Sequence, residues 1–201
     1  INSDALASLV TEVGGQPQVF PIMPDDREKI TATLKKAFRS ADVVIVTAGS
    51  SASTRDMTAE VFDSLGKPGV LVHGINVKPG KPTILAVCDG KPLIGLPGNP
   101  VSALVIAHLI VKPLIHRMIG LVHHRIQPVT SARLGVNLAS QAGRDDYFPV
   151  RLFRRSDHCI ADPIFYKSNL IFSLVRADGM VHIPSEVTGV PAGESVEVIL
   201  F

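Results

Sequence analysis

The sequence has no tryptophan, few other aromatic residues and little net charge, and these scarcities exclude one class of function. Only 5% of its 201 residues are aromatic, and the lysines and arginines are scattered around a net charge of +2. The chain has no arginine-rich run and no basic patch interleaved with aromatic side chains, which are the usual features of nucleic-acid binding. We therefore expect no nucleic-acid partner.

Cysteine is also scarce. The only two, Cys88 and Cys159, lie far apart and form no CxxC motif. They supply neither a zinc site nor a disulfide framework, so we expect two small core residues. This usage fits a reducing compartment, and we see no signal peptide, so we expect a cytoplasmic protein. The first residue is Ile1 rather than Met, which indicates a cut or processed N-terminus.

Long hydrophobic runs are absent, with one exception. The stretch Val101–Val111 is strongly apolar, but Lys112, Pro113, His116 and Arg117 soon follow it. A run this short does not cross a bilayer. We interpret it as a buried core helix and expect no membrane partner.

Helix and strand patterns alternate in the first part of the chain. With 46% hydrophobic residues, the chain can bury a core, and its length suits one large or two small domains. The expected elements are helices at 3–13, after Asp26, at 57–65 and from Val101, with strands at 19–23 and 41–49. Alternation of this kind predicts an α/β domain with a parallel-rich sheet between two layers of helices.

Ligands in such sheets bind beyond the carboxyl ends of the strands. We expect three loops at that edge, at residues 24–26, 47–56 and 96–100. After Gly120 the pattern changes to short β-rich runs separated by glycines, which predicts a small all-β barrel or sandwich. The predicted division is residues 1–120, a linker at 121–128, and residues 129–201.

The loop before the long helix has an unusual composition. Pro97, Gly98, Asn99 and Pro100 join an apolar strand to the helix, and Ser102 lies in its first turn. A helix N-terminus offers free N–H groups and a positive dipole end, which suit an anion. The alternative is a buried helix that is well capped by asparagine and begins with proline.

A serine-rich turn follows the strand at 41–49. Small and hydroxyl residues there, Gly49, Ser50, Ser51 and Ser53, would let the backbone approach and cradle a phosphate. The turn matches neither a P-loop nor a GxGxxG motif, and many such turns only connect elements. Both interpretations stay open from the residues alone.

Charged residues offer further candidates. Lys78 and Lys81 flank Pro79-Gly80 and would bind an oxyanion, or else lie at a solvated hairpin tip. Asp25 and Asp56 would hold Mg²⁺ together with substrate phosphate oxygens. The alternative for Asp25 is that it caps the following helix.

Together these motifs resemble one family. KPGKP followed by LPGNPVSA, after a strand that ends in a Gly/Ser-rich loop, resembles the molybdopterin molybdenumtransferase (MoeA-type) family, which includes the catalytic domain of gephyrin. The tail, from GRDDYFPVRL to GESVEVILF, is similar to that family's C-terminal β-domain. The resemblance covers essentially the whole chain. It implies a molybdopterin-binding α/β domain followed by a β-domain.

The resemblance also implies a reaction. Such enzymes insert molybdate into adenylylated molybdopterin with Mg²⁺ assistance and release AMP. By matching position, Asp25, Asp56, Lys78 and Lys81 would be catalytic, with the two aspartates on the metal. Ligand contacts are implied for the residues of the PGNP loop and the serine-rich turn and, from the β-domain, for Arg144 and Ser168.

The chain departs from the family pattern in two places. Its loop reads GSSASTRD where the family has GGVSVGDxD, so Arg55 stands where an acid is usual, and Gly74 replaces a frequent lysine. The family's TGDE strand and two N-terminal domains would precede Ile1. We therefore expect part of a longer enzyme that is a homodimer when complete. The alternatives are a non-catalytic binding or regulatory module and a scaffold.

Overall fold

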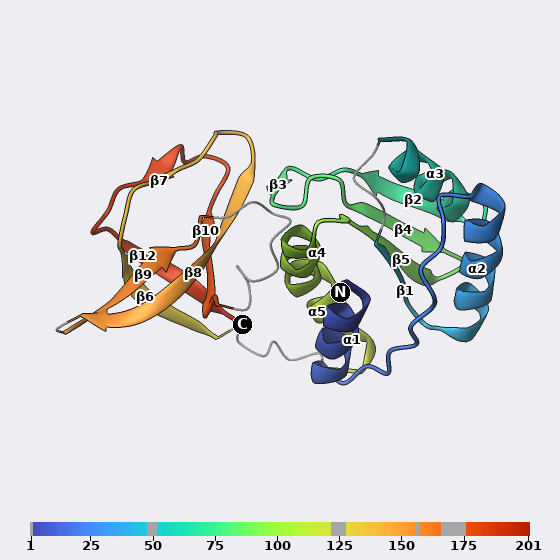
Figure 1. Ribbon diagram of the computed structural model, residues 1–201, viewed down its shortest axis with the longest axis horizontal. Helices are drawn as coiled ribbons and strands as arrows, with labels where there is room; N and C mark the ends of the chain where they lie inside the picture. Colours follow the sequence, from blue (N-terminus) through green and yellow to red (C-terminus); the bar gives the residue numbers. More distant parts are fainter. Residues whose placement is uncertain (1, 48–51, 122–127, 156, 166–175) are drawn as a thin grey trace. The chain divides into compact units, whose positions relative to one another are not determined.

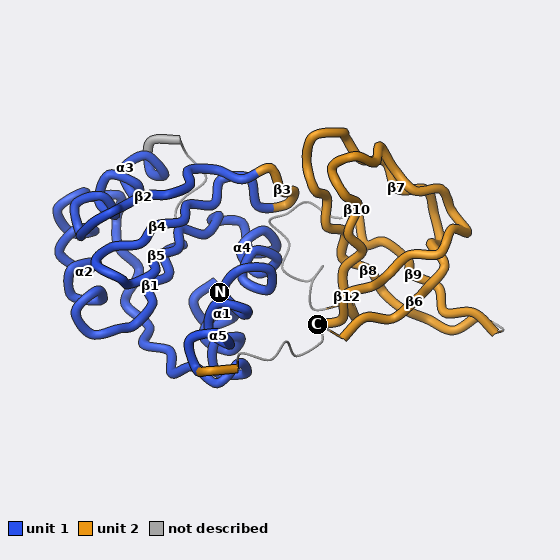
Figure 2. Tube along the Cα trace, turned by 180° about the vertical axis from the view of Figure 1, so that it is seen from behind, with its two compact units in different colours: residues 1–75, 80–119 blue, residues 76–79, 120–201 orange. Residues whose placement is uncertain are grey.

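The computed structural model describes residues 2–47, 52–121, 128–155, 157–165 and 176–201. The chain forms two compact units, one of residues 1–75 and 80–119 and the other of residues 76–79 and 120–201 (Figure 1, Figure 2). The short segment 76–79 belongs to the second unit because the strand within it pairs with a strand of that unit. This pairing is non-local, so the local sequence pattern does not reveal it.

The first unit combines a four-stranded sheet with helices. In chain order its elements are α1 (Asn2–Glu12), α2 (Arg27–Ser40), β1 (Val44–Thr47), α3 (Ala52–Asp63), β2 (Pro68–His73), β4 (Ile84–Cys88), β5 (Lys91–Leu96), α4 (Pro100–Ile106), η1 (Ala107–Val111) and α5 (Lys112–Met118). In Figure 1, α2 and α3 lie on one side of the sheet and α1, α4 and α5 on the other.

The sheet of the first unit is mixed, with strand order β1-β5-β4-β2. Within this sheet, β1 pairs parallel with β5, whereas β4 pairs antiparallel with both β5 and β2. The expectation of a parallel-rich sheet is therefore wrong for the described residues. The reason is local: Asp89 and Gly90, both with positive φ, form a two-residue turn between β4 and β5, which forces a hairpin.

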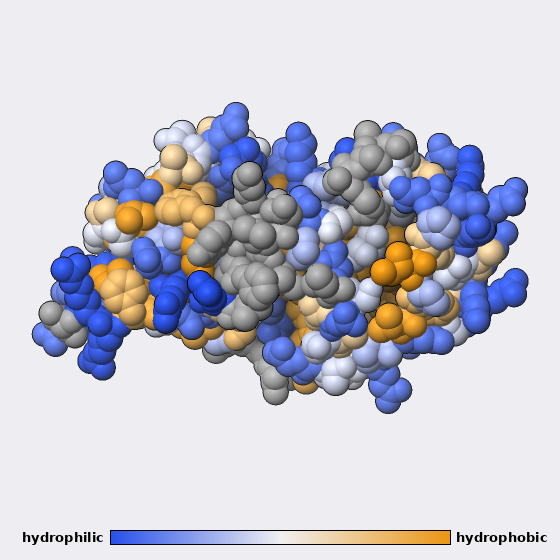
Figure 3. Space-filling model, in the orientation of Figure 1, coloured by the Kyte–Doolittle hydropathy of each residue, from blue (hydrophilic) through white to orange (hydrophobic). Residues whose placement is uncertain are grey.

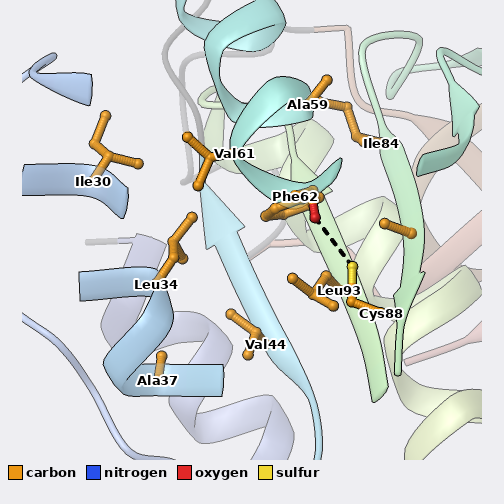
Figure 4. Close-up of a cluster of buried hydrophobic side chains, with 11 residues drawn as sticks. Ile30, Leu34, Ala37, Val44, Ala59, Val61, Phe62, Ile84, Cys88 and Leu93 are labelled. Atoms are coloured by element: carbon orange, nitrogen blue, oxygen red, sulfur yellow. Dashed lines mark hydrogen bonds between the residues drawn. The ribbon is translucent and has the colours of Figure 1, made fainter. Parts of the chain in front are cut away.

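The core of this unit forms where α2 and α3 meet the sheet. Ile30, Leu34 and Ala37 lie on one face of α2, at the helical spacing visible in the sequence. Phe62 of α3 and Leu93 of β5 are fully buried beside them (Figure 4). Each buried side chain of this size contributes about 1.5–3 kcal/mol through the hydrophobic effect. The α2 prediction is confirmed, and α3 starts five residues earlier than the predicted Met57.

Two side chains, Cys88 and Lys91, add polar contacts to this unit. Cys88 is fully buried, and its thiol donates a hydrogen bond to the carbonyl oxygen of Phe62 at 3.2 Å. Burial, with Asp89 and Asp63 nearby, raises the pKa of the Cys88 thiol. The Nζ atom of Lys91 donates to the Phe38 and Ala41 carbonyl oxygens, at 2.8 and 3.0 Å, which closes the C-terminal end of α2.

The strand expected at 19–23 does not form. Val19 is 57% exposed and Ile22 is 94% exposed, whereas Phe20 and Met23 pack against the core. A strand needs a neighbour that supplies hydrogen bonds, and no described strand pairs with this segment. Figure 3 shows apolar side chains at the surface of this unit.

The long helix Pro100–Met118 is the one described helix that is long and apolar enough to cross a membrane by length and composition. Its apolar residues instead build the unit's interior: Val105, Ile106, Ala107 and Val111 are all fully buried. A π-helical segment, η1, interrupts the α-helix. We interpret the helix as a core element.

The second unit is a β-barrel. Its strands are β3 (Val77–Lys78), β6 (Val129–Leu134), β7 (Leu138–Ala139), β8 (Asp145–Arg155), β9 (His158–Pro163), β10 (Gly179–Ile183), β11 (Gly189–Val190) and β12 (Ser195–Leu200). The pairings β8–β9, β9–β6, β6–β12, β12–β10 and β10–β8 close a five-stranded barrel, which leaves these strands without open edges. Val150, Ala161, Ile183 and Val198 are fully buried in its core.

Candidate functional site

Three loops leave the first unit's sheet at one edge. Thr47, the last residue of β1, pairs with Leu96, the last residue of β5, so the chain leaves both strands side by side. One row further in, Gly95 pairs with Ile84, and Ile84 pairs with His73 at the end of β2. The segments that follow Thr47, His73 and Leu96 therefore begin at the same edge, where α/β proteins bind ligands.

The PGNP loop spans the short gap between β5 and α4. Pro97 is buried, Pro100 occupies the first helical position, and Asn99 stands at the N-cap position with extended backbone angles. The Asn99 side chain makes no capping hydrogen bond. The expectation that its side chain caps the helix is therefore wrong, although the start of the helix is as predicted. Ser102, in the first helical turn, is only 5% exposed.

The first residue of α1 holds this loop. The Nδ2 atom of Asn2 donates a hydrogen bond to the carbonyl oxygen of Gly98 at 2.8 Å. The contact links two segments 96 residues apart, and sequence reasoning missed it because no local pattern signals it. It fixes a backbone carbonyl one residue before the N-cap position of α4.

Asp25 and Asp26 have different roles. Asp26 is the N-cap of α2: its Oδ1 accepts hydrogen bonds from the backbone N–H groups of Lys29 and Glu28, which lower the pKa of this carboxyl. The capping alternative for Asp25 is therefore wrong. Asp25 instead accepts a hydrogen bond at Oδ2 from the Thr54 hydroxyl, 3.4 Å away, in the first turn of α3.

Asp56 lies in the same first turns of α3. Its Oδ1 atom is 3.8 Å from Nε2 of His73, and both side chains are well exposed. Thr54 thus connects Asp25 to the helix that carries Asp56, which places both predicted metal ligands near the N-terminal end of α3. Among the described residues, no group of three His, Cys, Asp or Glu side chains forms a metal site.

Several predicted ligand-binding residues lie outside the described part of the chain. These are Gly49, Ser50 and Ser51 of the serine-rich turn and Ser168 of the second unit. The side chain of Ser53 is likewise not described. Their roles remain expectations.

The KPGKP lysines belong to different units. Lys78 lies on β3 and pairs with β8 opposite Asp146, whereas Lys81 follows the turn and its carbonyl accepts from Ile75 N–H at 2.9 Å. Both lysine residues are exposed, as expected. The turn is fixed by Thr83, whose hydroxyl donates to the Gly80 carbonyl oxygen at 2.6 Å. This is a structured loop between β2 and β4 rather than a simple hairpin tip.

Arg144 is held by a buried carboxylate. Its Nε and Nη2 atoms donate to the two Asp146 oxygens at 2.8 and 3.3 Å, and the Ser140 hydroxyl donates to Oδ2 at 3.0 Å. Asp146 is 1% exposed, while the Arg144 side chain is 32% exposed. The sequence analysis did not identify Asp146 or Ser140, although residues two apart on an extended strand share a face, so the GRDD motif carried a usable signal.

A second polar cluster on the barrel was also missed. His182 Nε2 lies 2.6 Å from Asp145 Oδ1, and the Tyr147 ring stacks on the imidazole with a 4.6 Å centroid separation. Burial and the nearby Asp145 raise the pKa of Tyr147.

On the long helix of the first unit, burial lowers the pKa of His108 to about 4, and the nearby Lys112 lowers it further. His108 lies within Val101–Val111, the stretch that we interpreted as a buried core helix.

Comparisons with known proteins assign both parts of the chain. Residues 1–117 match the family model described as a probable molybdopterin binding domain, and residues 131–201 match the MoeA C-terminal region, domain IV. A putative molybdopterin biosynthesis protein of Methanocaldococcus jannaschii is 33% identical over 99% of this chain and 46% of its own length. Molybdopterin molybdenumtransferase 2 of Mycobacterium tuberculosis is 32% identical over 98% of this chain and 49% of its own length.

Solved structures agree. A MoeA molybdopterin biosynthesis protein from Pyrococcus horikoshii matches with a TM-score of 0.85 and 38% identity, over 100% of this chain and 47% of that one. The chain spans about half the length of the curated relatives that it matches. With family models on both units and relatives above 30% identity along nearly all its residues, the chain belongs to the MoeA-type molybdopterin molybdenumtransferase family.

Proposed function

We propose that this chain is the molybdopterin-binding part of a longer molybdenumtransferase, which inserts molybdate into adenylylated molybdopterin and releases AMP. The observation that carries the proposal is the common edge of the sheet, where the segments after β1, β2 and β5 begin. One of these segments contains the PGNP loop and another contains Lys81, so an anion cradle and a cation start from the same edge. Family membership supplies the substrate class.

Each group would have a distinct task. The backbone N–H groups in the first turn of α4 would hold a pterin phosphate, because they lack helical partners and lie at the positive end of the dipole. Lys81 on the first unit, and Lys78 and Arg144 on the second, would each offer positive charge to molybdate or phosphate oxygens. Charges fixed in advance stabilise charge that develops in the transition state without reorganisation.

Asp25 and Asp56 would hold Mg²⁺. Their side chains supply exposed carboxylate oxygens, and Mg²⁺ typically takes one or two carboxylates together with substrate phosphate and water. When bound, this ion would supply positive charge to the phosphate oxygens. Thr54 would orient Asp25 through its hydroxyl.

The proposal includes the wider setting. It takes residues 1–120 as a three-layer α/β/α domain that is joined by a linker at 121–128 to the β-domain at 129–201. The complete protein would be a cytoplasmic homodimer without nucleic-acid or membrane partners. A non-catalytic binding module is the second candidate, favoured by the pairing of Asp56 with His73 beside a loop that lacks the family's acidic residue at Arg55.

AMP release distinguishes the two candidates. The 201-residue chain and the longer protein would each receive adenylylated molybdopterin, molybdate and Mg²⁺, and AMP would be measured over time. We expect turnover from the longer protein only, because the chain spans about half the length of the curated relatives that it matches. Equal turnover from both would contradict the incomplete-site proposal, and absence of turnover in the longer protein would favour the binding module.

A further inference from the structure

The Asp146 carboxylate has no evident stabilising reason to be buried. It is 1% exposed at one end of the barrel, on the strand face that also carries the core residues Phe148 and Val150. Removing a carboxylate from water costs several kcal/mol, and pairing it with an arginine often only balances that cost. Apolar side chains of similar size would stabilise a barrel equally well.

The geometry suits a different purpose, which is to fix the Arg144 guanidinium. Asp146 binds it bidentately through Nε and Nη2, which sets the plane of the group as well as its position. Ser140 in turn donates to Oδ2 and restrains the carboxylate. The contacts run from Ser140 through the buried Asp146 to Arg144, whose side chain is 32% exposed.

Within the described part of the chain, Asp146 uses only some of the guanidinium's donors. Of its five N–H groups, Asp146 takes one on Nε and one on Nη2, which leaves the two on Nη1 and one more on Nη2. Lys78 stands on the neighbouring strand, opposite Asp146 in the β3–β8 register. Lys78 is thus a second cation near Arg144, while Asp145 and Asp146 are two carboxylates at this end of the barrel.

We propose that Asp146 and Ser140 are positioning residues that aim the remaining Arg144 donors at an oxyanion. This rests on the proposed function, in which Arg144 contacts the ligand. The Asp146→Asn variant separates an orienting role from a purely electrostatic one, because the two predict opposite changes in anion affinity. Asp146→Asn removes a negative charge next to an anion site, so electrostatics alone would tighten anion binding, whereas loss of orientation would weaken it.

The experiment measures the affinity of the 201-residue chain for molybdate by calorimetric titration, with melting temperatures recorded without ligand. We expect Arg144→Ala to weaken binding about tenfold or more, since it removes charge-assisted hydrogen bonds. Asp146→Asn should weaken it by about tenfold despite the added positive charge. Ser140→Ala, which changes no charge, should weaken it about two- to fivefold, and it carries the test if Asp146→Asn fails to fold.

Arg151→Ala is the matched control, because Arg151 is an exposed arginine on β8. This variant should bind molybdate with the wild-type affinity. Unchanged or tighter binding in a folded Asp146→Asn, with weaker binding in Arg144→Ala, would overturn the positioning role alone. Unchanged binding in Arg144→Ala would overturn the assignment of Arg144 itself, and with it this inference.

Discussion

Acid should weaken the first unit through one histidine. His108 is half-buried on the long helix, and burial is the main cause that lowers its pKa from 6.5 to about 4, with Lys112 opposing its charge as well. In the unfolded chain the same imidazole takes up a proton near pH 6.5. The unfolded state therefore binds more protons between these two values, and stability falls as the pH drops through this window.

The magnitude follows from the two pKa values. Between about pH 7.5 and about pH 4.5, the linkage relation gives a loss of about 2.5 kcal/mol, which partial solvent exposure reduces to about 2 kcal/mol. Urea unfolding followed by circular dichroism at several pH values measures it. His108→Gln should remove this part of the pH dependence, and His116→Gln on the same helix should keep it. An unchanged pH profile in His108→Gln would refute the reasoning.

Three further predictions concern the core and the site. Phe62→Ala should cost about 3–5 kcal/mol in urea unfolding, because the side chain is fully buried; a cost below about 1 kcal/mol would contradict the described core. Asn2→Ala should remove the hydrogen bond to the Gly98 carbonyl and weaken molybdopterin binding. Asn2→Asp should weaken binding in the same way, because the carboxylate cannot donate this hydrogen bond. Wild-type affinity in both variants would exclude a positioning role for Asn2. Lys78→Ala and Lys81→Ala should each weaken molybdopterin binding and change the melting temperature little, since both lysines are exposed. If both variants lose thermal stability and keep the wild-type affinity for molybdopterin, the lysines only lie in a solvated loop.

Local patterns predicted the helices well but missed features set by distant partners. The buried face of α2 could be predicted from the helical spacing of Ile30, Leu34 and Ala37. The short β-rich runs predicted an all-β barrel or sandwich, and the structure confirms a barrel. The mixed sheet could have been foreseen, since Asp89-Gly90 is a strong two-residue hairpin signal. The absence of a strand at 19–23 could not, because pairing depends on a neighbour elsewhere in the chain.

The candidate site shows the same division. The exposure of Lys78 and Lys81 could be predicted from the Pro79-Gly80 turn between them. The start of α4 could be predicted from Pro100, which occupies the first helical position. Which of two adjacent aspartates caps α2 depends on one residue of register, and the structure assigns the cap to Asp26. The Asn2–Gly98 contact arises only when α1 and the PGNP loop meet in the folded unit.

Direct titration of adenylylated molybdopterin onto the 201-residue chain tests the central proposal most directly. We predict saturable binding to the wild-type chain, strongly weakened by Lys81→Ala and unaffected by Lys36→Ala, an exposed lysine on α2. No saturable binding by the folded wild-type chain, or equal affinity in both variants, would contradict the account.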